Sequence, residues 1–405
     1  MKKILLGTTA LVAVLAFAGS ANAQQAPLTI TLGGSVKVNA GLVDENQDKN
    51  LRGNALYSDS DLTVRVDGKT ANDVKYGARI RLQNQTSDTN NAERYMIYAS
   101  GDLGRIEGGN FNGAADRMAY YAPNKFGAGG IDGDYKTFVA NNISAASASG
   151  SGLIEGRNSI AGLTEMFKAF DTNYATKVTY FSPRFSGFQF GASFSPDTTG
   201  DTTSAAARSE KINFAVTAAN QGLLTRNDFQ NAYELGLNYV SEYEGVSVAA
   251  GVTYVGAEAK EDINNVARFE DLASVQIGGQ LGYQGWTFGG GYVDQGKSGY
   301  RKNPGLNSDG AKGYNVGLQY QTGPFIIGTN ALFAENEGLQ SVTRNNELNL
   351  YSAGVTYVVA PGLSTYVEGS FFEYTTSSND AGTAVGTARD DNDGTVIILG
   401  SKLEF

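Results

Sequence analysis

A short alternating stretch, residues 74–83 with the sequence VKYGARIRLQ, carries its basic residues on one side. Lys75, Arg79 and Arg81 share one parity, and the residues between them are apolar or small. Because successive side chains of a β-strand point to opposite sides of a sheet, the stretch predicts a strand with a cationic face. Such a face can attract anions and orient polar solutes. The whole chain is acidic, with a formal net charge of −10, so the role of this face depends on the space it borders.

The composition excludes several common chemistries. The chain contains no His and no Cys, which rules out His-dependent triads, His metal ligands, disulfides and thiolate metal sites. Two acidic clusters, residues 44–48 and 390–394, lack the ligand spacing of an EF-hand and are interpreted as solvated loops. We therefore expect no cofactor and no metal, and the acidic balance argues against nucleic-acid binding.

The N-terminus has the three parts of a secretory signal. Two lysines precede an apolar run over residues 4–18, and a small-x-small cleavage pattern follows at residues 21–23. The run is shorter than the roughly 20 residues of a transmembrane helix. We predict a cleaved signal peptide over residues 1–23 and a mature domain over residues 24–405. No later segment has the long apolar run of a membrane helix.

Apolar residues alternate with small or polar ones along much of the mature chain. Clear examples are residues 35–42, 233–239, 246–254 and 314–320. These strands are about ten residues long, whereas strands of soluble proteins usually have about five or six. A soluble β-sandwich would share the alternation, but its strands would be shorter.

The connections between the predicted strands are alternately short and long. Seven short turns and eight long polar segments separate sixteen strands, and all seven prolines fall outside the strand interiors. Short connections at one rim and long ones at the other are typical of an outer-membrane β-barrel. The fold class is therefore all-β, a closed antiparallel transmembrane barrel. Ten aromatic residues fit a girdle at the short-turn rim, or alternatively ordinary cross-strand pairs: Phe188, Phe190, Tyr239, Tyr243, Tyr283, Trp286, Tyr320, Phe325, Tyr357 and Tyr366.

The barrel determines which way the basic side chains of the first six strands point. Arg and Lys on a lipid-facing surface cost about 2–4 kcal/mol each at the bilayer midplane, so they should face the lumen. Parity places eight such residues opposite apolar positions: Lys37, Arg65, Lys75, Arg79, Arg81, Arg94, Arg105 and Lys177. As the candidate pore wall we take Arg65, Lys75, Arg79, Arg81, Arg94 and Lys177. The alternative is that some of these cations are solvated near a rim, without effect on permeation.

The C-terminal strand ends on an aromatic residue. Ile397, Leu399, Leu403 and Phe405 share one face, and no polar tail follows them. Chain ends commonly fray when nothing holds them in place. In a barrel, however, the last strand pairs with the first.

These segments resemble the general porins of Gram-negative outer membranes. Residues 93–106 (ERYMIYASGDLGRI) are similar to one hairpin of that family, and residues 178–192 (VTYFSPRFSGFQFGA) resemble the hairpin after its third long loop. The resemblance extends over essentially the whole mature chain. It implies a homotrimer in the outer membrane, in contact with lipid and lipopolysaccharide. It also implies that the strand ending at Phe405 is the signal for the outer-membrane assembly machinery.

The resemblance further implies that the longest loop, about residues 112–172, folds into the lumen. Residues 164–170 (TEMFKAF) are similar to a loop stretch of enterobacterial general porins, in which the position of Glu165 is a constriction acid. The family's second acid is replaced by Ala169. The candidate constriction acids are Glu165, Asp171 and Glu155. The alternative is that residues 164–170 form an apolar turn packed on the wall.

The sequence thus predicts an outer-membrane porin, a water-filled channel for passive diffusion of small hydrophilic solutes and ions. A substrate-preferring channel on the same barrel is the first alternative. A structural or adhesive surface barrel without an open pore is the second. An outer-membrane enzyme is disfavoured because the usual hydrolase chemistries need His.

Overall fold

The computed structural model describes thirteen segments of the chain: residues 27–47, 51–83, 92–140, 154, 159–172, 175–198, 211–212, 229–262, 268–300, 302, 310–337, 345–376 and 391–405. The predicted signal peptide and Glu155 lie outside them. Among the described helices, none is long and apolar enough to cross a membrane.

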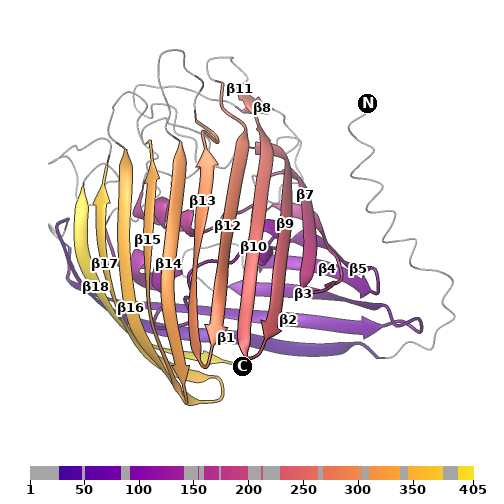
Figure 1. Cartoon of the computed structure of the whole chain (residues 1–405), viewed down its shortest axis with the longest axis horizontal. Helices are drawn as coiled ribbons and strands as arrows, with labels where there is room; N and C mark the ends of the chain where they lie inside the picture. The colour runs from indigo at the N-terminus through magenta and orange to yellow at the C-terminus, as the bar shows by residue number, and fades with distance from the viewer. Residues whose placement is uncertain are drawn as a thin grey trace.

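Sixteen antiparallel strands close into one barrel (Figure 1), which confirms the predicted fold class. They are β1 (Thr29–Glu45), β2 (Asn54–Lys69), β3 (Lys75–Gln83), β4 (Ala92–Gly101), β5 (Gly104–Asn110), β6 (Thr176–Phe181), β7 (Phe188–Asp197), β9 (Phe229–Tyr243), β10 (Val246–Ala259), β12 (Leu272–Tyr283), β13 (Trp286–Gly296), β14 (Ala311–Thr322), β15 (Phe325–Asn336), β16 (Asn346–Ala360), β17 (Leu363–Thr375) and β18 (Asn392–Glu404). Outside the barrel, β8 (Lys211–Ile212) and β11 (Glu261–Asp262) form a parallel pair.

The barrel closes where β18 pairs with β1. Ser35 lies opposite Glu404, and the register continues without a break to Glu45 opposite Gly394. Beyond β18, the backbone N–H and C=O of Phe405 exchange hydrogen bonds with Gly34, at 3.0 and 2.8 Å. Pairing of the last strand with the first is thus confirmed, and it leaves no open sheet edge in the barrel.

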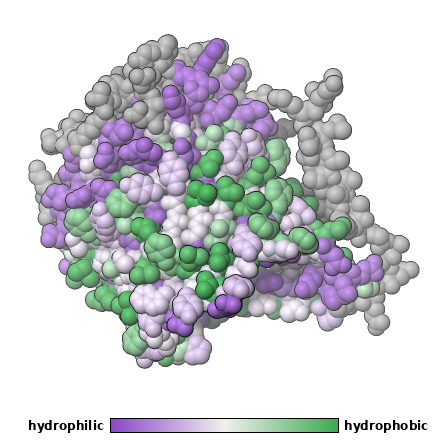
Figure 2. Space-filling view, in the orientation of Figure 1, coloured by the Kyte–Doolittle hydropathy of each residue, from purple (hydrophilic) through white to green (hydrophobic). Residues whose placement is uncertain are grey.

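Outward and inward residues alternate along the strands as the sequence parity predicts. On β4, for example, Ile97 is 64% exposed while its neighbour Met96 is 7% exposed. In Figure 2 hydrophobic side chains gather in a band across the visible wall, and hydrophilic ones gather towards the end that carries the long connections. An apolar outer surface with a polar rim is what lipid contact requires.

One member of the predicted aromatic girdle is placed differently. Tyr366 is 7% exposed, and its hydroxyl donates to Asn39 Oδ1 at 2.6 Å. It therefore points into the barrel, and the girdle prediction is wrong for this residue. Its parity is that of Glu368, which is also buried, whereas aromatic character alone indicated the outer face.

In its described part, the connection between β5 and β6 carries five short helical elements: α2 (Ala114–Met118), η1 (Gly130–Asp132), η2 (Asp134–Thr137), α3 (Ile160–Thr164) and η3 (Glu165–Phe167). η1 contacts β15 and β16, and η3 contacts β13, β14 and β15. α2 instead contacts β7, β9 and β10. In Figure 1 some of the helical turns are seen behind β13–β15. The contacts place this part of the connection against the inner face of the barrel strands.

An apolar core forms between this connection and the inward side chains of the later strands. Met166 and Phe167 are almost fully buried and belong to one cluster with Leu332, Leu348 and Ile398. On β18, Ile397 faces outward and Ile398 inward, so both faces are apolar there. The simple apolar–polar alternation fails at these positions because protein, and not water, covers the inner face.

Glycine makes part of this close contact feasible. A Cβ atom at Gly278 on β12 would collide with the carbonyl oxygen of Tyr120, and one at Gly328 on β15 would collide with the ring of Phe126. Neither glycine has a positive φ angle, so it is the missing side chain that matters at these positions. Larger residues there would push the connection away from the wall.

The assignment of the two faces predicts opposite tolerances to charge. Ile277 is outward and 57% exposed on β12, whereas Ser35 lines an internal cavity beside Asp61. We expect Ile277→Arg to lower the free energy of unfolding, measured in lipid vesicles, by up to about 2–4 kcal/mol. Ser35→Arg should lower it by less than about 1 kcal/mol. Urea titration of the folded fraction measures both. Equal losses would contradict the assigned faces.

Candidate functional site

Four of the predicted wall cations form two cross-strand pairs. Arg65 on β2 lies opposite Arg79 on β3, and Arg81 on β3 lies opposite Arg94 on β4. Like charges directly opposite each other destabilise a sheet. The structure thus brings these four guanidinium groups together on one patch of wall, where carboxylates or a bound anion must offset their repulsion.

The other two predicted wall residues lie apart from this patch. Lys75 is exposed at the first position of β3, beside the short turn from β2, and it lines neither of the two larger cavities described below. Lys177 is 4% exposed, and its ammonium donates to the carbonyl oxygens of Phe111 at 2.7 Å and Thr172 at 2.8 Å. Lys177 therefore joins the two ends of the β5–β6 connection.

Carboxylates on the same wall pair with several of these cations. Asp67 accepts from Arg65 at 2.8 Å, and Asp61 lies 3.7 Å from Arg81. Glu107 on β5 accepts from both Arg105 and Arg117. We did not predict these acids from the sequence, although each shares the inward parity of a wall cation, Asp67 with Arg65 and Glu107 with Arg105.

Two adjoining cavities open beside this wall, and they share Ser35, Asp61, Lys402 and Glu404. The first measures about 650 Å³, and its charged lining consists of Lys37, Asp59, Asp61, Arg81, Lys125, Lys402 and Glu404. The second measures about 680 Å³, and its charged lining consists of Asp61, Arg65, Arg79, Arg105, Arg117, Lys402 and Glu404. Cations outnumber carboxylates in both, most strongly in the second.

Inward side chains of the barrel hold the backbone of the β5–β6 connection. Glu368 on β17 accepts from the N–H groups of Ala128 at 2.8 Å and Gly130 at 2.9 Å. Glu234 on β9 accepts from Ala115 N–H at 2.9 Å. A buried backbone N–H without a partner is costly. These carboxylates therefore fix the connection to the wall, and they are not available to solutes.

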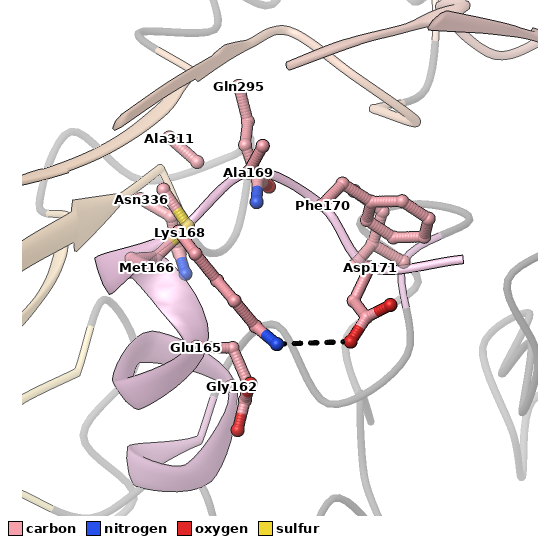
Figure 3. Close-up of a pocket in the computed structure, with 11 residues that line it drawn as sticks. Gly162, Glu165, Met166, Lys168, Ala169, Phe170, Asp171, Gln295, Ala311 and Asn336 are labelled. Atoms are coloured by element: carbon pink, nitrogen blue, oxygen red, sulfur yellow. Dashed lines mark hydrogen bonds and ion pairs between the residues drawn. The ribbon is translucent and has the colours of Figure 1, made fainter. Parts of the chain in front are cut away.

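The predicted loop acids lie close to lysines of the same connection. Glu165 is 2.9 Å from Lys136, and Asp171 is 3.1 Å from Lys168 (Figure 3). Burial alone would raise the pKa of Glu165, but attraction by Lys136 and Lys168 offsets it and lowers the pKa. Burial raises the pKa of Asp171 despite the attraction of Lys168.

Met166, Phe167 and Phe170 are buried in this region, so the apolar turn considered from the sequence is present. A cavity of about 140 Å³ remains between the turn and the wall (Figure 3). It is lined by both apolar residues and the Lys168–Asp171 pair. Glu165 belongs to the same turn, and half of its side chain is exposed.

One loop acid titrates near neutral pH. Desolvation by the surrounding protein raises the pKa of Asp132 to about 6, although 40% of its side chain is exposed and Lys136, 3.8 Å away, lowers the pKa. The folded protein therefore retains this proton at a higher pH than the unfolded chain does. Stability from this group is greatest below about pH 4 and is lost as the pH rises through 6. The β5–β6 connection also gains one negative charge over that rise.

Within the described ranges, no three His, Cys, Asp or Glu side chains are grouped so as to hold a metal ion. What the described wall offers is fixed charge beside water-accessible space. That arrangement can orient, attract or repel charged solutes by electrostatics and hydrogen bonding.

The anchoring of the connection is testable at Glu368. Glu368→Ala leaves the N–H groups of Ala128 and Gly130 without their acceptor, so we expect a loss of about 1–3 kcal/mol in the free energy of unfolding. Glu368→Gln keeps an acceptor oxygen and should lose less. Glu335→Ala is the control, because the pair that Glu335 makes with Lys312 is more exposed than the contacts of Glu368. Urea unfolding measures all three, and equal effects of Glu368→Ala and Glu335→Ala would contradict the anchor.

Comparisons with known proteins agree with this architecture. OmpT of Vibrio cholerae, an outer-membrane protein solved in a trimer form, is 11% identical with a TM-score of 0.56, and the match covers 94% of this chain and all of OmpT. A mutant of the Rh. blastica porin is 16% identical with a TM-score of 0.53, and the match covers 93% of this chain and all of that porin.

Sequence comparisons give the same direction. Uncharacterised proteins of Rickettsia felis and Rickettsia conorii are 26% and 24% identical over the full length of both chains. The family model described as "Gram-negative porin" matches residues 7–382. The match spans most of the chain, from the predicted signal region to beyond β17. The chain therefore belongs to the Gram-negative porin family, and it is located in the outer membrane.

Proposed function

We propose that this porin is an open, water-filled channel through which small hydrophilic solutes and ions diffuse passively. The observation that carries the proposal is the pair of adjoining cavities, about 650 and 680 Å³, lined by charged side chains inside a barrel with an apolar outer face. A barrel of sixteen strands leaves an aqueous interior unless protein fills it. The mature channel begins at residue 24, after cleavage of the signal peptide.

The β5–β6 connection narrows this channel from one side. Its contacts with β13–β16 and the apolar core around Met166 and Phe167 support a path for solutes displaced towards β1–β5. The connection reaches this wall as well, where Asp134 pairs with Lys37 on β1 at 2.8 Å. The cationic patch of Arg65, Arg79 and Arg81 then borders the path. A channel with a strong substrate preference would need a dedicated binding element. A plugged adhesive barrel would need the cavities closed.

Conductance tests the channel. Purified protein in a planar bilayer should give stable step increases in current, and their absence with well-folded protein would contradict the proposal.

Neutralising Arg79 and Arg81 together, by substitution with Gln, should move the reversal potential in a salt gradient towards cation preference, because positive charge is lost from the wall. Lys69→Gln, at an exposed turn pair with Asp73, is the control. An unchanged potential in the double variant would remove these residues from the narrow part.

We infer a homotrimer, with the outer face of β1–β5 as the contact between subunits. The large, exposed apolar side chains on these strands are all aliphatic, among them Ile30, Val38 and Ile97, whereas exposed aromatic residues begin at Tyr180 on β6. Amphipathic aromatic rings favour the lipid interface. The outward rings on these strands, Tyr76 and Tyr95, are both partly buried, and a face poor in exposed rings fits burial against another subunit. OmpT, which has a similar fold, forms a trimer. Lipid and lipopolysaccharide cover the remaining face, and the strand ending at Phe405 is read by the assembly machinery.

Single introduced cysteines test this contact, since the chain contains none. Val38→Cys should give cross-linked species with a short bismaleimide in outer-membrane vesicles. Tyr292→Cys on β13, exposed among aromatic neighbours, should not. Cross-linking efficiency on denaturing gels is the measurement. Efficient cross-linking at Tyr292 alone would place the contact elsewhere.

A further inference from the structure

The cavity of about 680 Å³ borders a group of four arginines that outnumber the carboxylates paired with them. Arg65 has Asp67 at 2.8 Å, while Arg105 and Arg117 share the single carboxylate of Glu107. In the part of the chain that the structure describes, Arg79 has no carboxylate within ion-pair distance. Four guanidinium groups thus have two carboxylates within ion-pair distance. The other two carboxylates of the lining, Asp61 and Glu404, pair with Arg81 and Lys402, so the excess positive charge is centred on Arg79.

Aromatic rings hold three of these guanidinium groups in place. Arg79 lies over the ring of Phe111 at 5.0 Å, Arg105 over Tyr98 at 3.8 Å, and Arg117 over Phe181 at 4.3 Å. Stacking on a ring restrains the planar fork of an arginine and leaves its edge N–H groups free to donate. Little side-chain freedom would then be lost when an anion binds.

The strand register adds an energetic reason for a ligand here. Arg65 and Arg79 are direct cross-strand neighbours, an arrangement that costs stability without an intervening anion. Both line the cavity, together with Phe111, Arg105 and Arg117. The cavity volume lies within the range of small-molecule sites, about 300–1,000 Å³.

We propose that this cavity is an oxyanion subsite, in which Arg79, assisted by Arg65 and Arg117, transiently binds the carboxylate or phosphate group of a passing solute. This deepens the proposed channel function and rests on it. The planar arginine fork matches the two oxygens of either group. Binding stays weak because the cavity is in contact with water, and a solute must leave as readily as it enters.

The test is solute block of single-channel current in KCl. Inorganic phosphate and succinate are added in separate titrations, with glucose as the uncharged control. We expect a saturable fall in current with at least one of the two anions and none with glucose. Block by phosphate alone, by succinate alone or by both shows whether the subsite binds phosphate groups, carboxylate groups or both. Normal current steps without saturable block by either anion would overturn the subsite and leave the channel function intact. Absence of steps would instead overturn the channel.

Variants assign the block to Arg79. Arg79→Gln should raise the half-blocking concentration about tenfold or more, because a charge-assisted hydrogen bond is lost. Arg79→Lys keeps the charge but not the planar fork, so this variant should also raise the half-blocking concentration. Phe111→Leu removes the ring under Arg79 and should weaken the block without changing any charge. Lys69→Gln should have no effect. Gel mobility before and after heating confirms folding, and block unchanged in folded Arg79→Gln would overturn the proposal.

Discussion

The pairing of β18 with β1 is the interaction on which the rest of this structure depends. In a bilayer core, unpaired backbone groups cost several kcal/mol each, so an open sheet edge is not tolerated. Closure from Ser35 opposite Glu404 to Glu45 opposite Gly394 removes that edge. Once the ring is closed, each strand residue faces either lipid or the interior. Parity then decides where charge is permitted, and the basic residues of β2–β5 must lie inside.

Closure also creates an interior wider than side chains alone can fill. The β5–β6 connection packs against buried side chains of the later strands, and it brings its own polar backbone, which needs partners wherever water is excluded. Glu234 and Glu368 supply acceptors, and Gly278 and Gly328 allow the close approach. The later strands thus hold a packed core, while the charged wall of the early strands keeps the open space. The asymmetry of the channel follows from where the connection is anchored.

Sequence parity predicted the strand faces well because lipid imposes one rule on every outward residue. It placed Arg65, Arg79 and Arg81 inside, but it could not pair them, since pairing depends on the register between strands. Lys177 shows the limit most clearly. Its parity was taken to place it on the pore wall, whereas its burial depends on the two connection ends that it joins. A distant segment leaves no local signal at Lys177. Tyr366 misled for a different reason, because its parity with the buried Glu368 indicated the inner face and only its aromatic character indicated the outer one.

The acidic net charge need not oppose a cationic wall. The candidate constriction acids would set up a transverse field across the channel if they faced that wall unpaired. In the structure, Glu165 lies beside Lys136 and Asp171 beside Lys168, so much of their field is offset within the connection. Screening by salt limits the distance over which exposed charges act to about 8–10 Å. The electrostatic potential in the second cavity therefore depends on the numbers of arginines and carboxylates that surround it. There two arginines share Glu107, and Arg79 has no acid partner among the described residues, whatever the sum over the whole chain.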